Sequence, residues 1–283
     1  MLKKIFKFLT FEIKAPKSFG WFHMISVSII TFLTTILCKK HKNDSEKSER
    51  RIAFWTWIVL FVLETYKQIV YIFVLEDDVF SVNYGWHGFP FQLCSAPLYV
   101  LPLIAFLPTG KLREAFVSFF GTFVLLGGVV VCIYPGNVLV TTLGINLHTM
   151  IWHGSQVFLG VYFNLRRFYS ENPPKIKEYF LRAVPIFLAF VAAAIILNLS
   201  VYKYLTANAM DDVFNMFFIS PYFECAFPVL NLIQAYTPYP VFLLSYLFFL
   251  SVFSFVIVYS ELWIVEKAKE RLKKQSVENA PSH

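Results

Sequence analysis

Long apolar segments constrain the fold of this chain more than any other feature. About seven of them approach the ~20 residues that an α-helix needs to cross ~30 Å of hydrocarbon. Because lipid offers the backbone no hydrogen-bond partners, such segments are expected to be helices. We therefore predict an all-α, polytopic transmembrane bundle of about seven helices, forming one domain over residues 20–263. The segments cover approximately residues 20–38, 52–74, 90–108, 115–134, 145–163, 179–200 and 238–263.

The composition excludes other classes of protein. Hydrophobic residues make up 57% of the chain and charged residues only 15%, whereas soluble domains are closer to half apolar and a quarter charged. The formal net charge of +7 could suggest a nucleic-acid partner. The basic residues lie between apolar segments, however, where they set the orientation of the chain in a bilayer. We expect membrane lipids and no nucleic acid as partners, and the sequence leaves the oligomeric state open.

The distribution of lysine and arginine predicts the orientation. These residues concentrate in 39–51, 109–114, 164–178 and the tail after 263, while 75–89 and 135–144 contain none. Since the more basic side faces the cytoplasm, we predict an N-out, C-in chain with a charged cytoplasmic tail at 264–283. The basic N-terminus does not fit this orientation. Its lysines alternate with apolar residues at helical spacing, which predicts an interfacial amphipathic helix within residues 1–19.

Polar side chains inside the spanning segments are costly and therefore informative about function. In the predicted orientation most of them fall in the outer halves of the helices. This distribution predicts a polar cavity that opens toward the outer leaflet. The side chains concerned are His23, Glu64, Lys67, Gln68, Gln92, Cys94, Asn146, His148, His153 and Gln156.

Cys94 and His153 are the candidate catalytic pair. Pro90 suits the first turn of a helix, which would place Cys94 near the positive end of that helix, where a thiolate is favoured. Asn146 and His153 are seven residues apart and share a helix face, whereas His148 is about 140° away from His153. An imidazole that accepts the thiol proton would let the thiolate attack an ester carbonyl and form an acyl-thioester. Gln92, Asn146 and Gln156 are then candidate oxyanion donors or His-orienting groups.

Structural explanations compete with this interpretation. A cysteine in an apolar helix is often a small core residue, and a lone histidine often forms an interhelical hydrogen bond. Glu64 and Lys67, three residues apart, are expected to form an ion pair. No CxxC spacing is present, and a Cys132–Cys225 disulfide on the outer side is supported by topology alone. A metal hydrolase using His23, His148 and His153 is a weaker alternative because HExxH spacing is lacking.

Several short motifs, taken in order, resemble one family. They are PFQLCS at 90–95, FFGTFVLLGGVVVCIYP ending at Pro135, MIWHG with His153, FNMFFISP with Asn215, and His23 in GWFHM. This order, over about residues 18–262, resembles the YwaF-type integral membrane proteins of bacteria. That family is similar to the transmembrane-protein-164-type acyltransferases, which remodel ether phospholipids through an acylated cysteine and a histidine.

The resemblance implies a lipid acyltransferase or acyl hydrolase of the bacterial cytoplasmic membrane, with Cys94 as acyl acceptor and His153 as the catalytic histidine. His23, Glu64, His148 and Asn215 would support the site or bind substrate, and no cofactor or metal is implied. The long connection at 201–237 departs from the family pattern. Because ether phospholipids of the animal type are not general in bacteria, the resemblance also leaves the lipid substrate open. The alternative is a non-enzymatic transporter or lipid-binding protein that uses Glu64 and Lys67, although the absence of an inverted repeat counts against common transporter builds.

Overall fold

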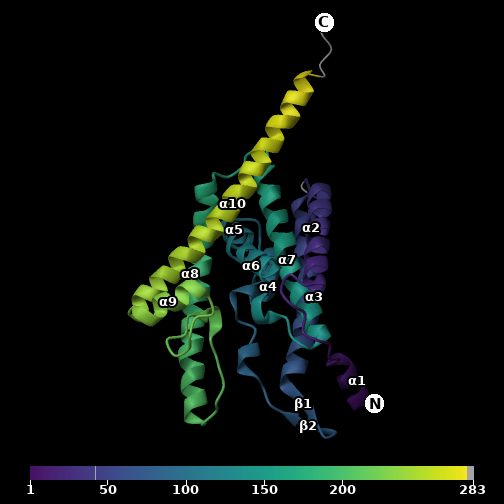
Figure 1. Cartoon of the computed structure of the whole chain (residues 1–283). Coiled ribbons are helices and arrows are strands. Elements are labelled where there is room, and N and C mark those ends of the chain that lie inside the picture. The colour runs from purple at the N-terminus through teal and green to yellow at the C-terminus, as the bar shows by residue number, and fades with distance from the viewer. Residues whose placement is uncertain (42, 279–283) are drawn as a thin grey trace.

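The computed structural model describes residues 1–41 and 43–278, and most of these residues are helical (Figure 1). The all-α prediction is confirmed, since each predicted apolar segment contains a helix. The N-terminus and the C-terminal part of α10 lie at opposite ends of the bundle, and α10 crosses it obliquely. The helices are α1 (Leu2–Leu9), α2 (Trp21–His41), α3 (Glu46–Ile72), α4 (Pro97–Phe106), α5 (Lys111–Phe119), α6 (Leu125–Ile133), α7 (Leu143–Phe168), α8 (Ile176–Ala207), α9 (Pro228–Tyr236) and α10 (Tyr239–Glu278).

Four helical stretches of the described chain are long and apolar enough to cross a membrane. They are Trp21–His41, Lys111–Ile133, Ile176–Ala207 and Tyr239–Arg271, which is compatible with a multi-pass integral membrane protein. Helices α3 and α7 are also long but carry more charged and polar residues, and α4 is short. Helix α10 continues without a break through residue 264, where the sequence predicts a separate tail.

The third predicted segment differs from the expectation. Residues 90–96 do not form the first turns of a helix, because Leu93–Ser95 is a single 3₁₀ turn and α4 begins only at Pro97. The prediction that Pro90 opens this helix is therefore wrong. Proline suits the start of a helix because its missing N–H needs no partner there, and Pro97 takes that role. Cys94 thus lies in a turn that precedes α4.

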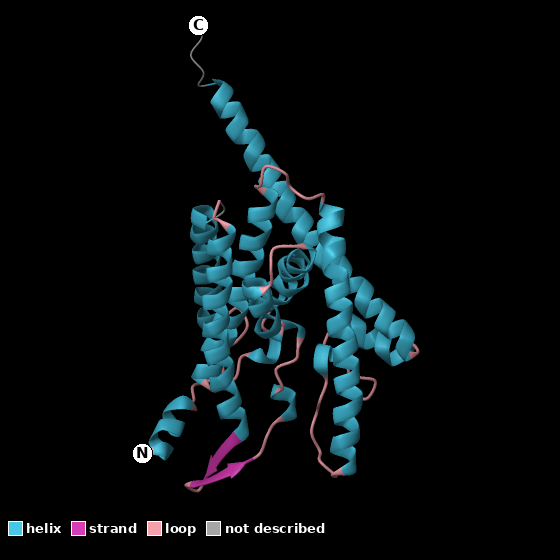
Figure 2. Cartoon of the chain, turned by 180° about the vertical axis from the view of Figure 1, so that it is seen from behind, coloured by secondary structure: helices cyan, strands magenta, loops and turns pink. Residues whose placement is uncertain are grey.

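A β-hairpin follows α3 at the end of the bundle where the N-terminus lies (Figure 2). Its strands, β1 (Phe73–Glu76) and β2 (Val79–Val82), pair antiparallel, and the turn residues Asp77 and Asp78 have positive φ. Aspartate tolerates this conformation better than most residues. The sequence did not predict this hairpin.

Helix α1 packs on the hairpin rather than standing alone. The rings of Phe6 and Phe80 meet edge to face, with centroids 5.4 Å apart, and the ammonium of Lys7 lies 3.2 Å from the carboxylate of Asp78. The hydrogen bond from Lys7, with the charges of Lys3 and Lys7, holds the pKa of Asp78 below its ordinary value. The other face of α1 exposes apolar side chains, as expected for an amphipathic helix in an interface.

The centre of the bundle is a π-helical stretch at Phe120–Val124, between α5 and α6, whose side chains are fully buried. A π turn is wider than an α turn and leaves backbone groups that need other partners. The Gly121 carbonyl accepts a hydrogen bond from the Asn164 amide of α7 at 2.8 Å. A Cβ at Gly121 would lie 2.1 Å from the Asn164 amide oxygen, so glycine permits this contact. Packing and interhelical hydrogen bonds of this kind are what hold helices together in lipid.

An ion network joins three helices at the opposite end from the hairpin. Glu49 of α3 is fully buried, and its carboxylate contacts the guanidinium groups of Arg113 on α5 and of Arg166 and Arg167 on α7. Arg167 also makes a two-pronged ion pair with Glu114 of α5, with distances of 2.8 and 3.1 Å. Bidentate guanidinium–carboxylate pairs are among the stronger polar contacts in proteins. The network therefore fixes the relative positions of α3, α5 and α7.

Candidate active site around Cys94 and His153

The backbone of Cys94 is held against α7. Its carbonyl oxygen accepts hydrogen bonds from the Trp152 indole at 2.7 Å and from the Gln156 amide. Helix α6 closes the other side, because a Cβ at Gly127 would lie 4.0 Å from the Cys94 Cα and 3.7 Å from the Gln156 amide oxygen. Cys94 is partly exposed, whereas the other cysteines, Cys38, Cys132 and Cys225, are buried. The turn that carries Cys94 is thus fixed in place by α6 and α7.

His153 lies on the same helix as the two groups that hold Cys94. The Nδ1 atom of its ring is 2.7 Å from the Thr149 carbonyl oxygen. Since a carbonyl can only accept, Nδ1 must carry the hydrogen, and this fixes the tautomer. The lone pair of the neutral ring then lies on Nε2, which is buried and has no hydrogen-bond partner among the described residues. His153 is therefore arranged to accept a proton at Nε2.

Two charged groups of α3 form an ion pair that faces α7. The Lys67 ammonium is 2.7 Å from the Glu64 carboxylate, which confirms the predicted ion pair, and the Gln68 amide donates to Glu64 at 2.6 Å. The Glu64 carboxylate also faces His148 of α7. No hydrogen bond joins Cys94 to His153 in the part of the chain that the structure describes.

His148 faces α3 rather than His153, as its angular position on α7 predicts. Its Nε2 atom is 3.6 Å from the Glu64 carboxylate, and its ring stacks on Trp152 with centroids 5.0 Å apart. Because Trp152 donates to the Cys94 carbonyl, His148 supports the group that positions Cys94. The sequence reasoning missed Trp152 and Thr149, although both lie within one turn of His153.

Four buried polar atoms in this region have no hydrogen-bond partner among the described residues. They are Oε2 of Glu64, Nε2 of His148, Nε2 of His153 and Oε1 of Gln156. Oε2 of Glu64 and Nε2 of His148 face each other at 3.6 Å as an ion pair, which leaves Nε2 of His153 and Oε1 of Gln156 without a partner among the described residues. An unsatisfied buried polar atom costs about 1–3 kcal/mol, so native proteins contain few of them. Two such atoms one turn apart on α7, beside Cys94, are typical of a site that binds a polar group.

The other predicted residues are engaged elsewhere. Gln92 donates to the Asn215 carbonyl at 2.8 Å and accepts from the Phe217 amide at 2.7 Å, so its amide is not free to stabilise an oxyanion. Asn146 uses its amide on the backbone N–H and carbonyl of Val140. Asn215 bonds to the backbone of Glu224 and Ser220. These amides hold the backbone in place, and only Gln156 of the three proposed donors lies beside Cys94.

His23 and the cysteine pair also have structural explanations. The His23 ring accepts from the Phe19 amide at 3.0 Å and lies 2.9 Å from the Cys132 carbonyl oxygen, so both ring nitrogens are occupied. Cys132 and Cys225 are not bonded to each other, so the structure does not contain the disulfide considered above. No cluster of three His, Cys, Asp or Glu side chains suited to a metal occurs within the described residues.

Two adjacent glycines allow a matched test of the packing around the site. A Cβ at Gly128 would lie 2.9 Å from the His153 carbonyl oxygen and 2.8 Å from the Gln156 Cβ, whereas Gly127 has room for one. Gly128→Ala is expected to destabilise the protein by about 1–3 kcal/mol through overpacking. Gly127→Ala is expected to be neutral or to stabilise by up to about 1 kcal/mol, because alanine favours helix. Unfolding of both variants in mixed micelles measures the difference, and equal stability would contradict the packing described here.

Comparison of the chain with family models, with curated proteins and with solved structures gave no match. The assignment of the candidate site is therefore supported by its geometry and by the sequence motifs.

Proposed function

We propose that this protein is a membrane-embedded acyltransferase or acyl hydrolase that moves a fatty acyl chain from a lipid through an acyl-thioester on Cys94. The observation that carries the proposal is the unpartnered Nε2 of His153, whose tautomer the Thr149 carbonyl fixes, on the helix that holds the Cys94 turn. The order of motifs that resembles the YwaF-type proteins supports it. The proposed topology has about seven spanning helices with the N-terminus outside, in the bacterial cytoplasmic membrane.

The first half-reaction forms the thioester. Nε2 of His153 accepts the proton of the Cys94 thiol, and the thiolate sulfur attacks the ester carbonyl carbon of the lipid. When the tetrahedral intermediate collapses, the bond from this carbon to the alkoxy oxygen breaks. The departing oxygen takes the proton from His153. One S–C bond has formed, one C–O bond has broken, and the imidazole is neutral again.

The second half-reaction releases the acyl chain. A lipid hydroxyl or a water molecule gives its proton to Nε2 of His153, and its oxygen attacks the thioester carbonyl. The C–S bond then breaks, and the proton returns to the sulfur. The overall change exchanges one ester for another, or hydrolyses an ester, so no redox or energy-carrying cofactor takes part. The Lys67 ammonium, paired with Glu64 on the neighbouring helix α3, is the candidate group to stabilise negative charge during each step.

Trapping the thioester tests the proposal. Purified protein is incubated with a phospholipid labelled in its acyl chain, denatured in acid and digested. We expect an acyl label on the peptide that contains Cys94, and neutral hydroxylamine should remove it, as it does thioesters. Cys132→Ala, which removes a buried cysteine, should keep the label, whereas Cys94→Ala should lose it. Normal turnover by purified Cys94→Ala would refute the mechanism.

The buried group of Glu64, Lys67 and His148 favours a second candidate, a non-enzymatic carrier or binding protein for a lipid or small solute. Charged groups buried within a bundle often mark a ligand pathway. The same experiment separates the two functions. A carrier would bind the labelled lipid without acylating any cysteine, and its binding would depend on Glu64 but not on Cys94.

A further inference from the structure

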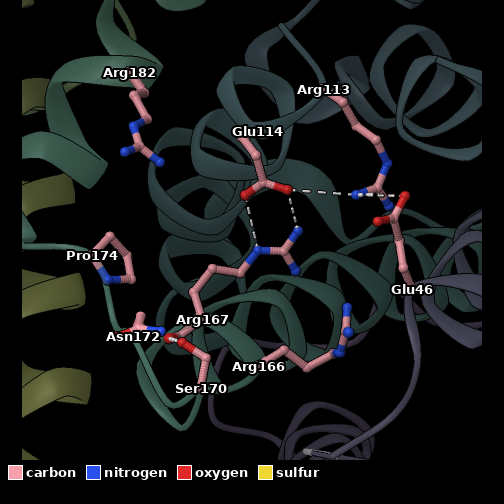
Figure 3. Close-up of a pocket in the computed structure, with 9 residues that line it drawn as sticks. All are labelled: Glu46, Arg113, Glu114, Arg166, Arg167, Ser170, Asn172, Pro174 and Arg182. Atoms are coloured by element: carbon pink, nitrogen blue, oxygen red, sulfur yellow. Dashed lines mark hydrogen bonds and ion pairs between the residues drawn. The ribbon is translucent and has the colours of Figure 1, made fainter. Parts of the chain in front are cut away.

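A separate pocket of about 390 Å³ lies where the connection between α7 and α8 passes the ends of α3 and α5 (Figure 3). His153 and Arg167 are fourteen residues apart on α7, which corresponds to about 21 Å along the helix axis, so this pocket is distinct from the Cys94 site. Its lining is dominated by charge. The charged residues that line it are Glu46, Arg113, Glu114, Arg166, Arg167 and Arg182.

Three of these arginines are already neutralised within the protein. Arg113, Arg166 and Arg167 surround the buried Glu49, and Arg167 also pairs with Glu114. Glu46 belongs to the same network. A hydrogen bond from Thr109, together with the charges of the neighbouring arginines, holds the pKa of Glu46 below its ordinary value. The carboxylates of the network are thus all committed to partners within the protein.

Arg182 is different. Its guanidinium comes no closer than 4.0 Å to the Glu178 carboxylate and has 44% of its side chain exposed. Figure 3 shows it across the pocket from Arg113 and Glu46, with no interaction drawn to the other lining residues. Among the described residues it donates no hydrogen bond. Asn172, in the connection between α7 and α8, also lines the pocket and is exposed. The donors of these two side chains face the pocket and remain available.

The charges of the pocket match a singly charged anion. Four guanidinium groups line it, against the carboxylates of Glu46 and Glu114 and of Glu49 behind them. Arg50 also pairs with Glu46, and Glu178 lies 4.0 Å from Arg182. With these two included, five guanidinium groups face four carboxylates, so one positive charge is left over. Helix α8 begins at Ile176, two residues after the lining residue Pro174, and Glu178 lies in its first turn. That carboxylate offsets the positive end of the helix, so the attraction for an anion rests on the guanidinium groups.

We infer that this pocket binds the phosphodiester of an anionic phospholipid, with Arg182 and Asn172 as its donors. A phosphodiester carries one negative charge, and a guanidinium can donate two parallel hydrogen bonds to it. The basic loops place this end of the bundle on the cytoplasmic side, where the leaflet is rich in anionic lipid. This inference does not depend on the proposed acyl transfer.

Titration of the full-length protein in uncharged detergent tests the inference. Short-chain phosphatidylglycerol is the probe, diacylglycerol of the same chain length, which lacks the phosphodiester, controls for the lipid body, and inorganic phosphate tests the free anion. We expect phosphatidylglycerol to bind and to raise the melting temperature. Arg182→Gln should weaken that binding at least tenfold, and Arg182→Lys, which keeps the charge, should weaken it less. Arg51→Gln removes an exposed arginine at the same end of the bundle and should bind like the wild type.

Three outcomes would overturn the inference. If wild type and Arg182→Gln bind phosphatidylglycerol equally, the pocket is not the binding site. If Arg51→Gln weakens binding as much as Arg182→Gln does, the lipid is attracted by the general surface charge of this end of the bundle. If inorganic phosphate binds as tightly as phosphatidylglycerol, with the same dependence on Arg182, the ligand is a free anion and not a lipid. The melting temperatures without ligand show whether each variant is folded. Since Arg182 is largely free of contacts, its replacement should leave that temperature unchanged.

Discussion

His153→Ala is expected to lower the rate of acyl transfer by about a thousandfold or more while the protein still folds and inserts. In the proposed mechanism the imidazole takes up one proton and gives it back in each half-reaction, and a positioned acid–base group commonly contributes a factor of 10²–10⁴ to the rate. The loss should appear in kcat rather than in KM, because the Nε2 atom interacts with the reacting groups and not with the lipid body. Initial rates with a labelled phospholipid measure it.

Two further histidines are the controls for this variant. His87 lies near the β-hairpin and is exposed, so His87→Ala should keep the wild-type rate. His148→Ala removes the ring that stacks on Trp152 and faces Glu64. His148→Ala should lower the rate by less than His153→Ala, because His148 helps to position Cys94 and does not transfer the proton. If His148→Ala abolished activity and His153→Ala did not, the roles assigned to the two rings would be exchanged.

The helices of the bundle could be predicted because hydrocarbon leaves the backbone few alternatives to helix. The same reasoning failed at residues 90–96, where the composition is apolar but the backbone turns before Pro97. Apolar content cannot separate a helix from a buried turn whose carbonyls are satisfied by other segments. The Cys94 carbonyl is satisfied by Trp152 and Gln156 of α7, and such contacts between distant segments are not visible in a local pattern.

For the candidate site, the sequence predicted contacts within one helix but not contacts between distant segments. Helical geometry placed His148 away from His153, and the spacing of Glu64 and Lys67 predicted their ion pair. The partners of the amides were not predictable. Gln92 and Asn215, far apart in the sequence, meet because the segment between α8 and α9 returns into the bundle, where Phe214, Met216 and Phe217 are buried. Polar residues near the candidate catalytic cysteine can thus form hydrogen bonds to the backbone instead of taking part in the reaction.

Glu49→Gln is expected to destabilise the folded protein by about 3–5 kcal/mol. The Glu49 carboxylate is fully buried among Arg113, Arg166 and Arg167, and removal of one member of a buried ion pair leaves uncompensated charge. Glutamine keeps the size of the side chain but leaves three guanidinium groups facing one another. Unfolding of purified protein in mixed micelles, followed by circular dichroism, measures the change.

A matched variant and a double variant separate this effect from a general loss of charge. Glu171→Gln removes an exposed carboxylate at the same end of the bundle and should change the stability by less than about 0.5 kcal/mol. Adding Arg166→Gln to Glu49→Gln removes one of the unpaired charges, so the double variant should be less destabilised than the two single effects combined. Strict additivity would show that Glu49 and Arg166 do not interact. The contact between Glu49 and Arg167 would then be what joins α3 to α7, because Arg167 of α7 reaches the same carboxylate.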